Sequence, residues 1–369
     1  MMLAVFSSFE AVAQTAADPA TVADVVVTST TSEKQATALQ SEPVAATIIT
    51  QDQIRALQID NLDQAKKLAP SLTAKRTSIQ NLTYNIRGVG NADATALLGI
   101  FGGVPIYVDG VYLPRPGAWT TDLPDLFGIQ VLKGPQSTHG GWDSTGGAVQ
   151  VGTALPSFAQ ESKLALSYGS YNHVQLKGSV TGPIDGSDKA AFRVAIYGTD
   201  RDGYIQSVNS GTRYNDWRDK GVRAQLLLQP DNDLTARLIV DYSQADTNCC
   251  VFLPNAAVTQ YANGAALVNN FFVRAARVGY APLSFDALSR YNTDLTGAYP
   301  SERVENYGAS IDVHYNMNGY TLSSLTAFRQ YDYHPHWFNN TQINVDTDRA
   351  ANPQNTARSL QQEVKISTP

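Results

Sequence analysis

The sequence has 369 residues, a formal net charge of −6 and only 16% charged residues. This length allows about two domains, the charged fraction is low for a soluble surface, where about a quarter is typical, and the mildly acidic balance argues against a nucleic-acid partner. The sequence contains no run of about 20 apolar residues, which excludes a transmembrane helix. Composition therefore leaves a transmembrane β-barrel or a large secreted all-β protein.

The first residues have features of an export signal. A short apolar patch, Leu3–Phe6, precedes Ala11–Ala13, where small residues alternate as at a cleavage site. No Lys or Arg precedes the patch, and Glu10 interrupts it, so either the true start lies upstream or the match is a coincidence. We predict that residues 1–13 are the remnant of a signal peptide.

Residues 14–40 are predicted to form a flexible leader. They are rich in Ala, Thr, Ser and Asp, and such a segment buries too little apolar surface to fold on its own. Its one β-branched run can extend and pair with the edge of a foreign sheet. This run is Asp24, Val25, Val26, Val27 and Thr28.

A mixed pattern over residues 41–156 predicts a compact α+β domain. We expect a first strand at 44–49, a helix capped by Thr50, and a second helix at 61–68 that Pro70 ends. Short strands between glycine-rich turns are predicted at 84–87, 105–108, 129–132 and 148–152.

After Pro156 only long alternating segments remain. In 307–316, for example, Tyr307, Ala309 and Ile311 share one face, while Ser310 lies on the other. About eight strands are predicted, near 162–170, 173–182, 189–201, 217–229, 233–244, 304–316, 319–331 and 358–367.

The connections between these strands alternate in length. Tight turns are predicted at 183–188, 230–232 and 317–319, and long links at 202–216, 245–303 and 332–357. Short turns on one side and long loops on the other are typical of an outer-membrane barrel, whose long loops face outwards. The pattern favours this architecture over the alternative, a soluble β-sandwich.

Several short motifs follow one another in a fixed order. They are Glu42–Val44, Ala69–Leu72, Ile86–Gly90, Val104–Val111, Val131–Ser137 and Gly146–Val149. The ordered set resembles the plug of TonB-dependent outer-membrane receptors, and the resemblance covers roughly residues 24–369. The motif residues carried over are Arg87, Gly88, Asp109, Gly110, Lys133, Gly134, Pro135, Gly146 and Gly147.

The resemblance implies an α+β plug domain at 41–156 and a partial antiparallel transmembrane β-barrel at 157–369. Plugged transporters have 22 strands, so about 8 of 22 are expected here. The sequence stops without the aromatic terminal strand by which such barrels are usually recognised for assembly. We therefore expect a truncated chain that neither inserts nor transports alone, because open sheet edges in lipid leave backbone groups unpaired.

Two charges in the motifs lie beside glycines in otherwise apolar strands. A buried charge requires a partner, and a barrel wall would offer partners to Arg87 and Asp109; the alternative is that each is a solvated turn charge. The family usually carries two glutamates before the Lys-Gly-Pro motif, where this sequence has Phe127 and Gln130. This departure puts the charge contacts between plug and barrel in doubt.

The resemblance also implies a function. Residues 24–28 would be the TonB box, which pairs with TonB by adding a strand to it, and the monomeric protein in the outer membrane would take up a ferric siderophore or another iron chelate. The plug and the box would lie in the barrel lumen and on its periplasmic side. By position, Asp93, Arg115 and Trp119 are candidate ligand-binding residues. A transporter of cobalamin or oligosaccharides and a passive porin are the alternatives.

Cys249 and Cys250 are adjacent at the head of the link 245–303. They can form a strained ring with each other, bond to other groups or stay free; we predict a vicinal disulfide in an extracellular loop. No metal site is expected, because the nearest histidines, such as His314, are far along the chain. No recognisable catalytic motif is present, so neither an enzyme nor a cofactor is predicted.

Overall fold

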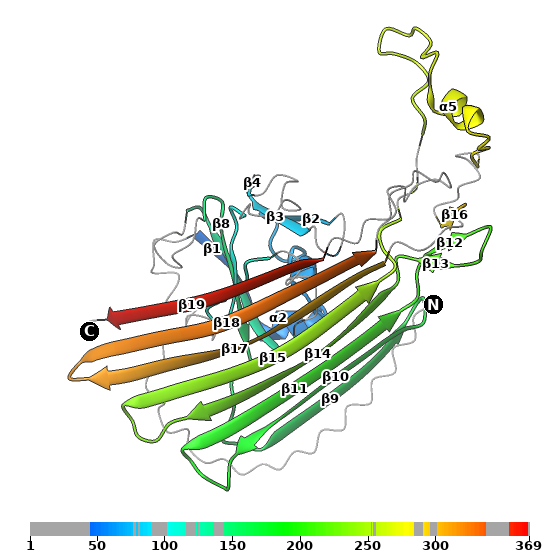
Figure 1. Ribbon diagram of the computed structural model, residues 1–369. Helices are drawn as coiled ribbons and strands as arrows, with labels where there is room; N and C mark the ends of the chain where they lie inside the picture. Colours follow the sequence, from blue (N-terminus) through cyan, green and yellow to red (C-terminus); the bar gives the residue numbers. More distant parts are fainter. Residues whose placement is uncertain are drawn as a thin grey trace.

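The computed structural model describes residues 45–76, 79, 82–90, 102–115, 123, 125–135, 144–251, 253, 256–283, 291–295, 301–336 and 354–367. Two structured parts stand out in Figure 1: an N-terminal domain of short elements, and a large curved sheet whose hollow side this domain occupies. The predicted signal remnant, leader and TonB box lie outside the described residues, as do Asp93 and Trp119.

The N-terminal domain combines two small sheets with two short helices. One sheet has the order β1-β7-β8-β5-β6 and the other the order β2-β3-β4. The elements are β1 (Ala45–Ile49), α2 (Gln51–Ala56), α3 (Leu62–Ala65), β2 (Leu72–Arg76), β3 (Leu82–Ile86), β4 (Val89–Gly90), β5 (Ile106–Val108), β6 (Val111–Tyr112), β7 (Leu126–Lys133) and β8 (Gly147–Thr153).

Local sequence sets the helix ends of this domain. Thr50 caps α2 in a capping box: the Gln53 N–H donates to the Thr50 side chain, and the Gln53 side chain accepts from the Thr50 N–H. The second predicted helix is shorter than expected, because the Leu68 N–H bonds to the carbonyl of Ala65, three residues back. The last turn is therefore tighter than an α-helix.

The core of the N-terminal domain lies between its sheets and helices. Ile49, Ile129 and Val149 are fully buried, although they come from strands β1, β7 and β8. Strands β7 and β8 read as nearly continuous apolar runs, as expected for strands covered on both faces. The predicted α+β class is confirmed for this domain.

The second part is an antiparallel sheet of eight long strands, which we call the wall sheet. Its order is β19-β18-β17-β15-β14-β11-β10-β9. The strands are β9 (Glu161–Gly169), β10 (His173–Pro183), β11 (Ala190–Arg201), β14 (Trp217–Leu228), β15 (Leu234–Thr247), β17 (Ser301–Met317), β18 (Tyr320–His336) and β19 (Asn355–Ser367). All eight predicted strands are present, and among the described strands β9 and β19 are the two free edges of a sheet that does not close.

The wall sheet buries the face that a soluble protein would expose. On β15, Arg237 is only 4% exposed, whereas Val240 is 49% exposed. On β17, Glu302 and Asn306 are buried, while Ile311 on the opposite face is exposed. A β-sandwich would bury its apolar face, so that alternative is wrong; polar-in and apolar-out is the pattern of a membrane barrel wall.

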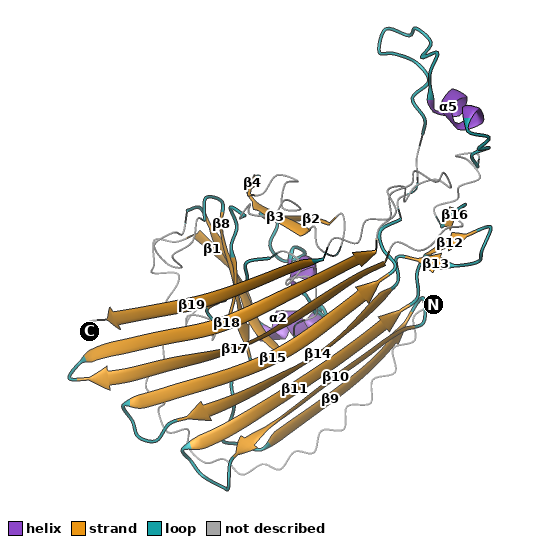
Figure 2. Cartoon of the chain, in the orientation of Figure 1, coloured by secondary structure: helices purple, strands orange, loops and turns teal. Residues whose placement is uncertain are grey.

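The predicted long links contain short elements that periodicity did not reveal. Strands β12 (Ile205–Ser207), β13 (Arg213–Tyr214) and β16 (Asn292–Thr293) form a small sheet, and α5 (Phe271–Arg277) lies further out. Figure 2 shows them beyond one end of the wall sheet, with tight turns at the opposite end. Among the described residues, no helix is long and apolar enough to cross a membrane.

Candidate functional site

The candidate site is the interface between the N-terminal domain and the wall sheet, and Asp109 is its centre. Asp109 and Gly110 form the tight turn between β5 and β6, with φ angles of 49° and 79°. Positive φ is costly for most residues but open to Gly and tolerated by Asp. The turn directs the Asp109 side chain, which is 1% exposed, towards the wall.

Four groups hold the Asp109 carboxylate. Thr153 at the end of β8 donates from its backbone N–H at 3.0 Å and from its hydroxyl at 2.8 Å. From the wall sheet, Arg223 on β14 donates to Oδ2, and Arg237 on β15 lies 3.4 Å from Oδ1. Such charge-assisted bonds are stronger than neutral ones, and in a site shielded from water they are screened little.

The environment shifts the acidity of Asp109. Burial by itself would raise the pKa of this carboxyl, because it disfavours the charged form. The charges of Arg237 and Arg223, together with the bonds from Thr153, outweigh burial and hold the pKa of Asp109 below its ordinary value. The N-terminal domain therefore presents a carboxylate to a cationic wall.

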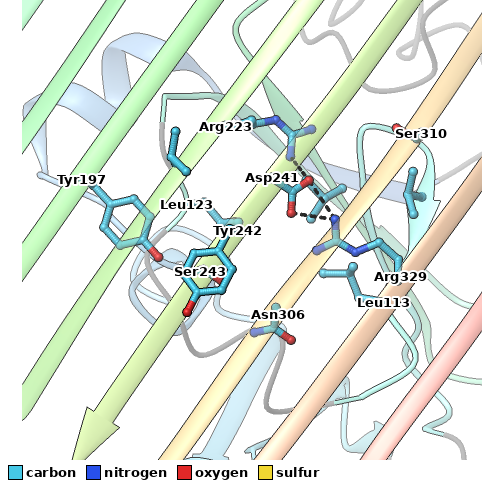
Figure 3. Close-up of a pocket in the computed structure, with 13 residues that line it drawn as sticks. Leu113, Leu123, Tyr197, Arg223, Asp241, Tyr242, Ser243, Asn306, Ser310 and Arg329 are labelled. Carbon is cyan, nitrogen blue, oxygen red and sulfur yellow. Dashed lines mark hydrogen bonds and ion pairs between the residues drawn. The ribbon is translucent and has the colours of Figure 1, made fainter.

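Ion pairs within the wall sheet also hold its arginines in place. Arg223 also donates to Asp241 on β15 at 3.1 Å, and Arg329 on β18 donates to both Asp241 oxygens at 2.6 and 2.7 Å. Figure 3 shows this Arg223–Asp241–Arg329 bridge across the strands. A cavity of about 40 Å³ lies beside it, between Leu113 of the N-terminal domain and the wall.

Further contacts repeat this polarity, with acids on the N-terminal domain and bases on the wall. Asp125 pairs with Arg193 on β11, whose side chain is only 5% exposed. Asp60 pairs with Lys177 on β10 and also accepts from Gln175 at 3.2 Å. Among the described residues, the interface thus has three acid–base contacts spread over four strands of the wall.

Two contacts on β17 and β19 do not pair an acid of the N-terminal domain with a base of the wall. Glu302 of β17 accepts from the backbone N–H of Ile79 at 2.7 Å. Gln361 of β19 accepts from the Tyr112 N–H at 2.9 Å and donates to the Gly110 carbonyl at 3.2 Å. Both wall side chains therefore bind the backbone of the N-terminal domain.

These contacts resolve the doubt raised by Phe127 and Gln130. Neither side chain carries a charge. Gln130 is buried within the N-terminal sheet, and Phe127 is half-buried. Aspartates at other positions carry the charge contacts to the wall instead. The wall partners were not identified from the sequence. Arginines on the polar face of predicted strands, as at positions 193, 223 and 237, are the feature that could have indicated them.

The other motif residues have structural places of their own. Gly147 pairs with Lys133 across strands β8 and β7, and a Cβ at Gly147 would lie 2.2 Å from the Leu132 carbonyl oxygen. The Gly134 N–H donates to the Gly146 carbonyl at 3.2 Å, so the two glycine motifs meet.

Not every motif charge is buried. Asp109 is buried and paired, but Arg87 lies exposed in the turn before β4, followed by Gly88. Among the described residues, the exposed position of Arg87 fits the alternative of a solvated turn charge, and a wall partner for Arg87 stays a prediction. Among the candidate ligand residues, Arg115 is half-buried shortly after β6, and its charge acts on Tyr112.

The cysteine pair lies at the end of the wall. The sulfurs of Cys249 and Cys250 lie against each other, just beyond the end of β15, as the predicted vicinal disulfide requires. Both side chains are half-buried, and a carboxylate oxygen of Glu302 lies close to them. The disulfide itself stays a prediction to be tested in solution.

Comparisons with known proteins agree with this architecture. Residues 38–148 match the family model for the TonB-dependent receptor plug domain. The ferric yersiniabactin uptake receptor FyuA from Yersinia pestis is similar in structure, with a TM-score of 0.63 and 17% identity over 79% of this chain and 41% of its own.

Two further solved structures show the same fold. The ferripyoverdine receptor of the Pseudomonas aeruginosa outer membrane has a TM-score of 0.60 and 15% identity over 80% of this chain and 35% of its own. The ferric-catecholate import receptor Fiu from E. coli K12 has a TM-score of 0.58 and 15% identity over 88% of this chain and 44% of its own.

The chain thus spans less than half the length of these receptors. Its N-terminal domain is a plug, and the wall sheet has the fold of part of a receptor barrel. This family and fold are those of transporters rather than enzymes. With a TonB-dependent receptor plug domain at residues 38–148 bound to the concave face of the wall sheet, the chain has the fold of part of a TonB-dependent receptor.

Proposed function

We propose that a receptor containing this plug and wall sheet acts in the TonB-driven uptake of a ferric siderophore or another iron chelate across the outer membrane. The observation that carries the proposal is the plug carboxylate Asp109 bound by Arg223 and Arg237 of the wall. A plug held by reversible charge contacts can be released by mechanical work without breaking the barrel. Uptake by pulling on the plug needs such an attachment.

Two further observations support the proposal. The similar structures include receptors for ferric yersiniabactin, ferripyoverdine and ferric catecholates. The outer face of the wall sheet is apolar and exposed at positions such as Leu164, Leu238 and Leu360, which suits contact with lipid. An outer-membrane location follows from the proposal, with the plug in the lumen.

TonB is the proposed energy source, and residues 24–28 are the proposed TonB box. The run would leave the plug, add a strand to TonB in the periplasm and transmit force to the plug. Deletion of 24–28 is expected to abolish energised uptake of radioactive ferric chelates while leaving their binding intact. Deletion of the equally long segment 30–34 is the control, and loss of binding in the 24–28 variant would refute the role.

The ligand class is tested by binding rather than uptake. Catecholate, hydroxamate and phenolate ferric chelates, cobalamin and oligosaccharides are titrated against the protein in detergent, and the proposal expects saturable binding of at least one ferric chelate. Saturable binding of cobalamin or an oligosaccharide alone would select the alternative cargo. Transport that persists without TonB would select the passive porin.

Arg115, Asp93 and Trp119 are the proposed ligand contacts. A cation pairs with an anionic chelate, and an indole ring stacks on an aromatic or cationic group. Alanine at Arg115 or Trp119 is expected to weaken binding of the identified chelate at least about tenfold, equivalent to about 1.4 kcal/mol. Arg55→Ala, on the exposed side of α2, is the control, and unchanged affinity in both variants would remove these residues from the site.

A further inference from the structure

In the folded chain the two cysteines lie beside Glu302, a residue that is distant from them in the sequence. Cys249 lies two residues after Thr247, the last residue of β15. Thr247 is directly opposite Glu302 at the start of β17. This register places the Glu302 carboxylate beside both sulfurs, although more than fifty residues separate them in the chain. One carboxylate oxygen and the two sulfurs lie within 4.8 Å of one another.

Glu302 is held in place rather than free to rotate into solvent. It is 3% exposed, and it accepts hydrogen bonds from the Ile79 N–H at 2.7 Å and the Tyr333 hydroxyl at 3.0 Å. A fixed second set of partners orients a ligand in the way that metal sites require.

The site is also reachable. An open hollow of about 340 Å³ adjoins Glu302, and its charged lining mixes Asp246 and Glu305 with Arg218 and Arg303. The cysteines themselves are half-buried, so an ion can approach the sulfurs without entering the plug core.

We propose that Cys249, Cys250 and Glu302 form a binding site for a thiophilic divalent cation when the cysteines are reduced. Two thiolates and one carboxylate are donors that Zn²⁺ and its heavier relatives accept, with water as a fourth ligand. A ferric ion is a hard acid with weaker preference for thiolates, so this site is separate from the iron-chelate uptake proposed above. The proposed cation site does not depend on the proposed uptake function.

The redox step balances with a dithiol donor. The donor loses two electrons and two protons and closes to its own disulfide, while the Cys249–Cys250 bond opens to two thiols. The cation then displaces both thiol protons as it binds, so affinity rises with pH. The disulfide form lacks thiolates and does not bind the ion.

The test uses the full chain in detergent micelles and Cd²⁺ alone as the probe. The protein is reduced with dithiothreitol, freed of it by gel filtration under argon, and titrated while thiolate-to-metal ultraviolet absorption is recorded. One Cd²⁺ per chain is expected, with none bound by the oxidised protein. Cys249→Ser and Cys250→Ser should each abolish the absorption band.

The carboxylate is tested separately. Glu302→Gln is expected to weaken Cd²⁺ binding at least about tenfold, and Glu302→Asp should retain part of the affinity. Glu305→Gln, whose carboxylate lies outside the group, is the matched control with unchanged affinity. Circular dichroism identifies folded variants. Equal affinity in Glu302→Gln and the starting protein would overturn the site, as would failure of the fully reduced chain to bind Cd²⁺.

Discussion

Asp109 of the plug and Arg223 of the barrel wall form a buried ion pair between residues 114 positions apart in the chain. The pair is the centre of a plug attachment in which plug aspartates contact basic residues of the wall. The following predictions test this attachment, the lipid-facing wall and the cysteine pair.

Asp109→Asn is expected to loosen the plug strongly. The substitution removes the Asp109 charge from the buried Arg237 and leaves Arg223 with Asp241 as its remaining acidic partner. Breaking a buried pair in this way costs about 3–5 kcal/mol. The measurement is guanidinium unfolding in detergent together with hydrogen exchange of strands β5 and β8. Asp188→Asn, in an exposed turn, is the control, and equal behaviour of the two variants would contradict the assigned role.

Plug attachment should depend on pH through Asp109. Its pKa is lowered in the folded protein, so the unfolded chain binds the proton more tightly. The contribution of Asp109 is then complete above the ordinary carboxyl pKa of about 3.9 and is lost as pH falls through the lower, folded value. Protease protection of the plug is measured from neutral to acidic pH. In Asp109→Asn this part of the pH dependence should disappear; an unchanged acid profile would count against it.

Asp125 and Arg193 should be energetically coupled. A double-mutant cycle with Asp125→Asn and Arg193→Gln is expected to give about 1–3 kcal/mol, because both side chains are largely buried. The exposed pair Lys163–Glu161, at 3.6 Å, serves as the control cycle with a coupling of about 0–1 kcal/mol. Unfolding midpoints provide the four free energies, and couplings of the same size in both cycles would show that the plug contact has no special weight.

The outward face of β15 should tolerate a charge according to depth. Val240→Arg, near the middle of the strand, is expected to cost about 2–4 kcal/mol in a bilayer, and Leu234→Arg, beside the turn, only about 0–1 kcal/mol. Both positions share the outer face. Folding of a receptor that contains this wall sheet into lipid vesicles, followed by urea titration, compares them, and a larger loss at Leu234 than at Val240 would contradict a lipid-facing wall.

Cys249 and Cys250 are expected to be joined as isolated from the outer membrane. Alkylation with iodoacetamide in denaturant without reductant should add no mass, and after reduction it should add two adducts. The readout is intact mass. Two adducts before reduction would refute the vicinal disulfide.

Much of the fold was readable from the sequence because its signals are local. The period of two located all eight wall strands, and Thr50 with Gln53 marked the start of α2. The ends were less certain: β17 and β18 run from residue 301 to 317 and from 320 to 336, so they extend into the predicted long links. Pairing with neighbouring strands extends a strand beyond its own alternating pattern.

The site was only partly readable. The sequence marked Asp109 by its place in a plug motif, and Arg87 by the same reasoning, yet only Asp109 is buried. The difference lies in what surrounds each turn: Asp109 points into the wall sheet, whereas Arg87 projects into solvent. The sequence motif does not report which groups surround each turn in the folded protein.

By its periodicity and the order of its motifs, the sequence determined a plug domain followed by alternating strands. Tertiary structure alone decided that the polar face of those strands is buried, that Arg223 and Arg237 meet Asp109, and that Glu302 lies beside Cys249. Periodicity reports only which residues share a face. Which face is covered, and which distant charges meet, depends on how the plug is seated against the wall.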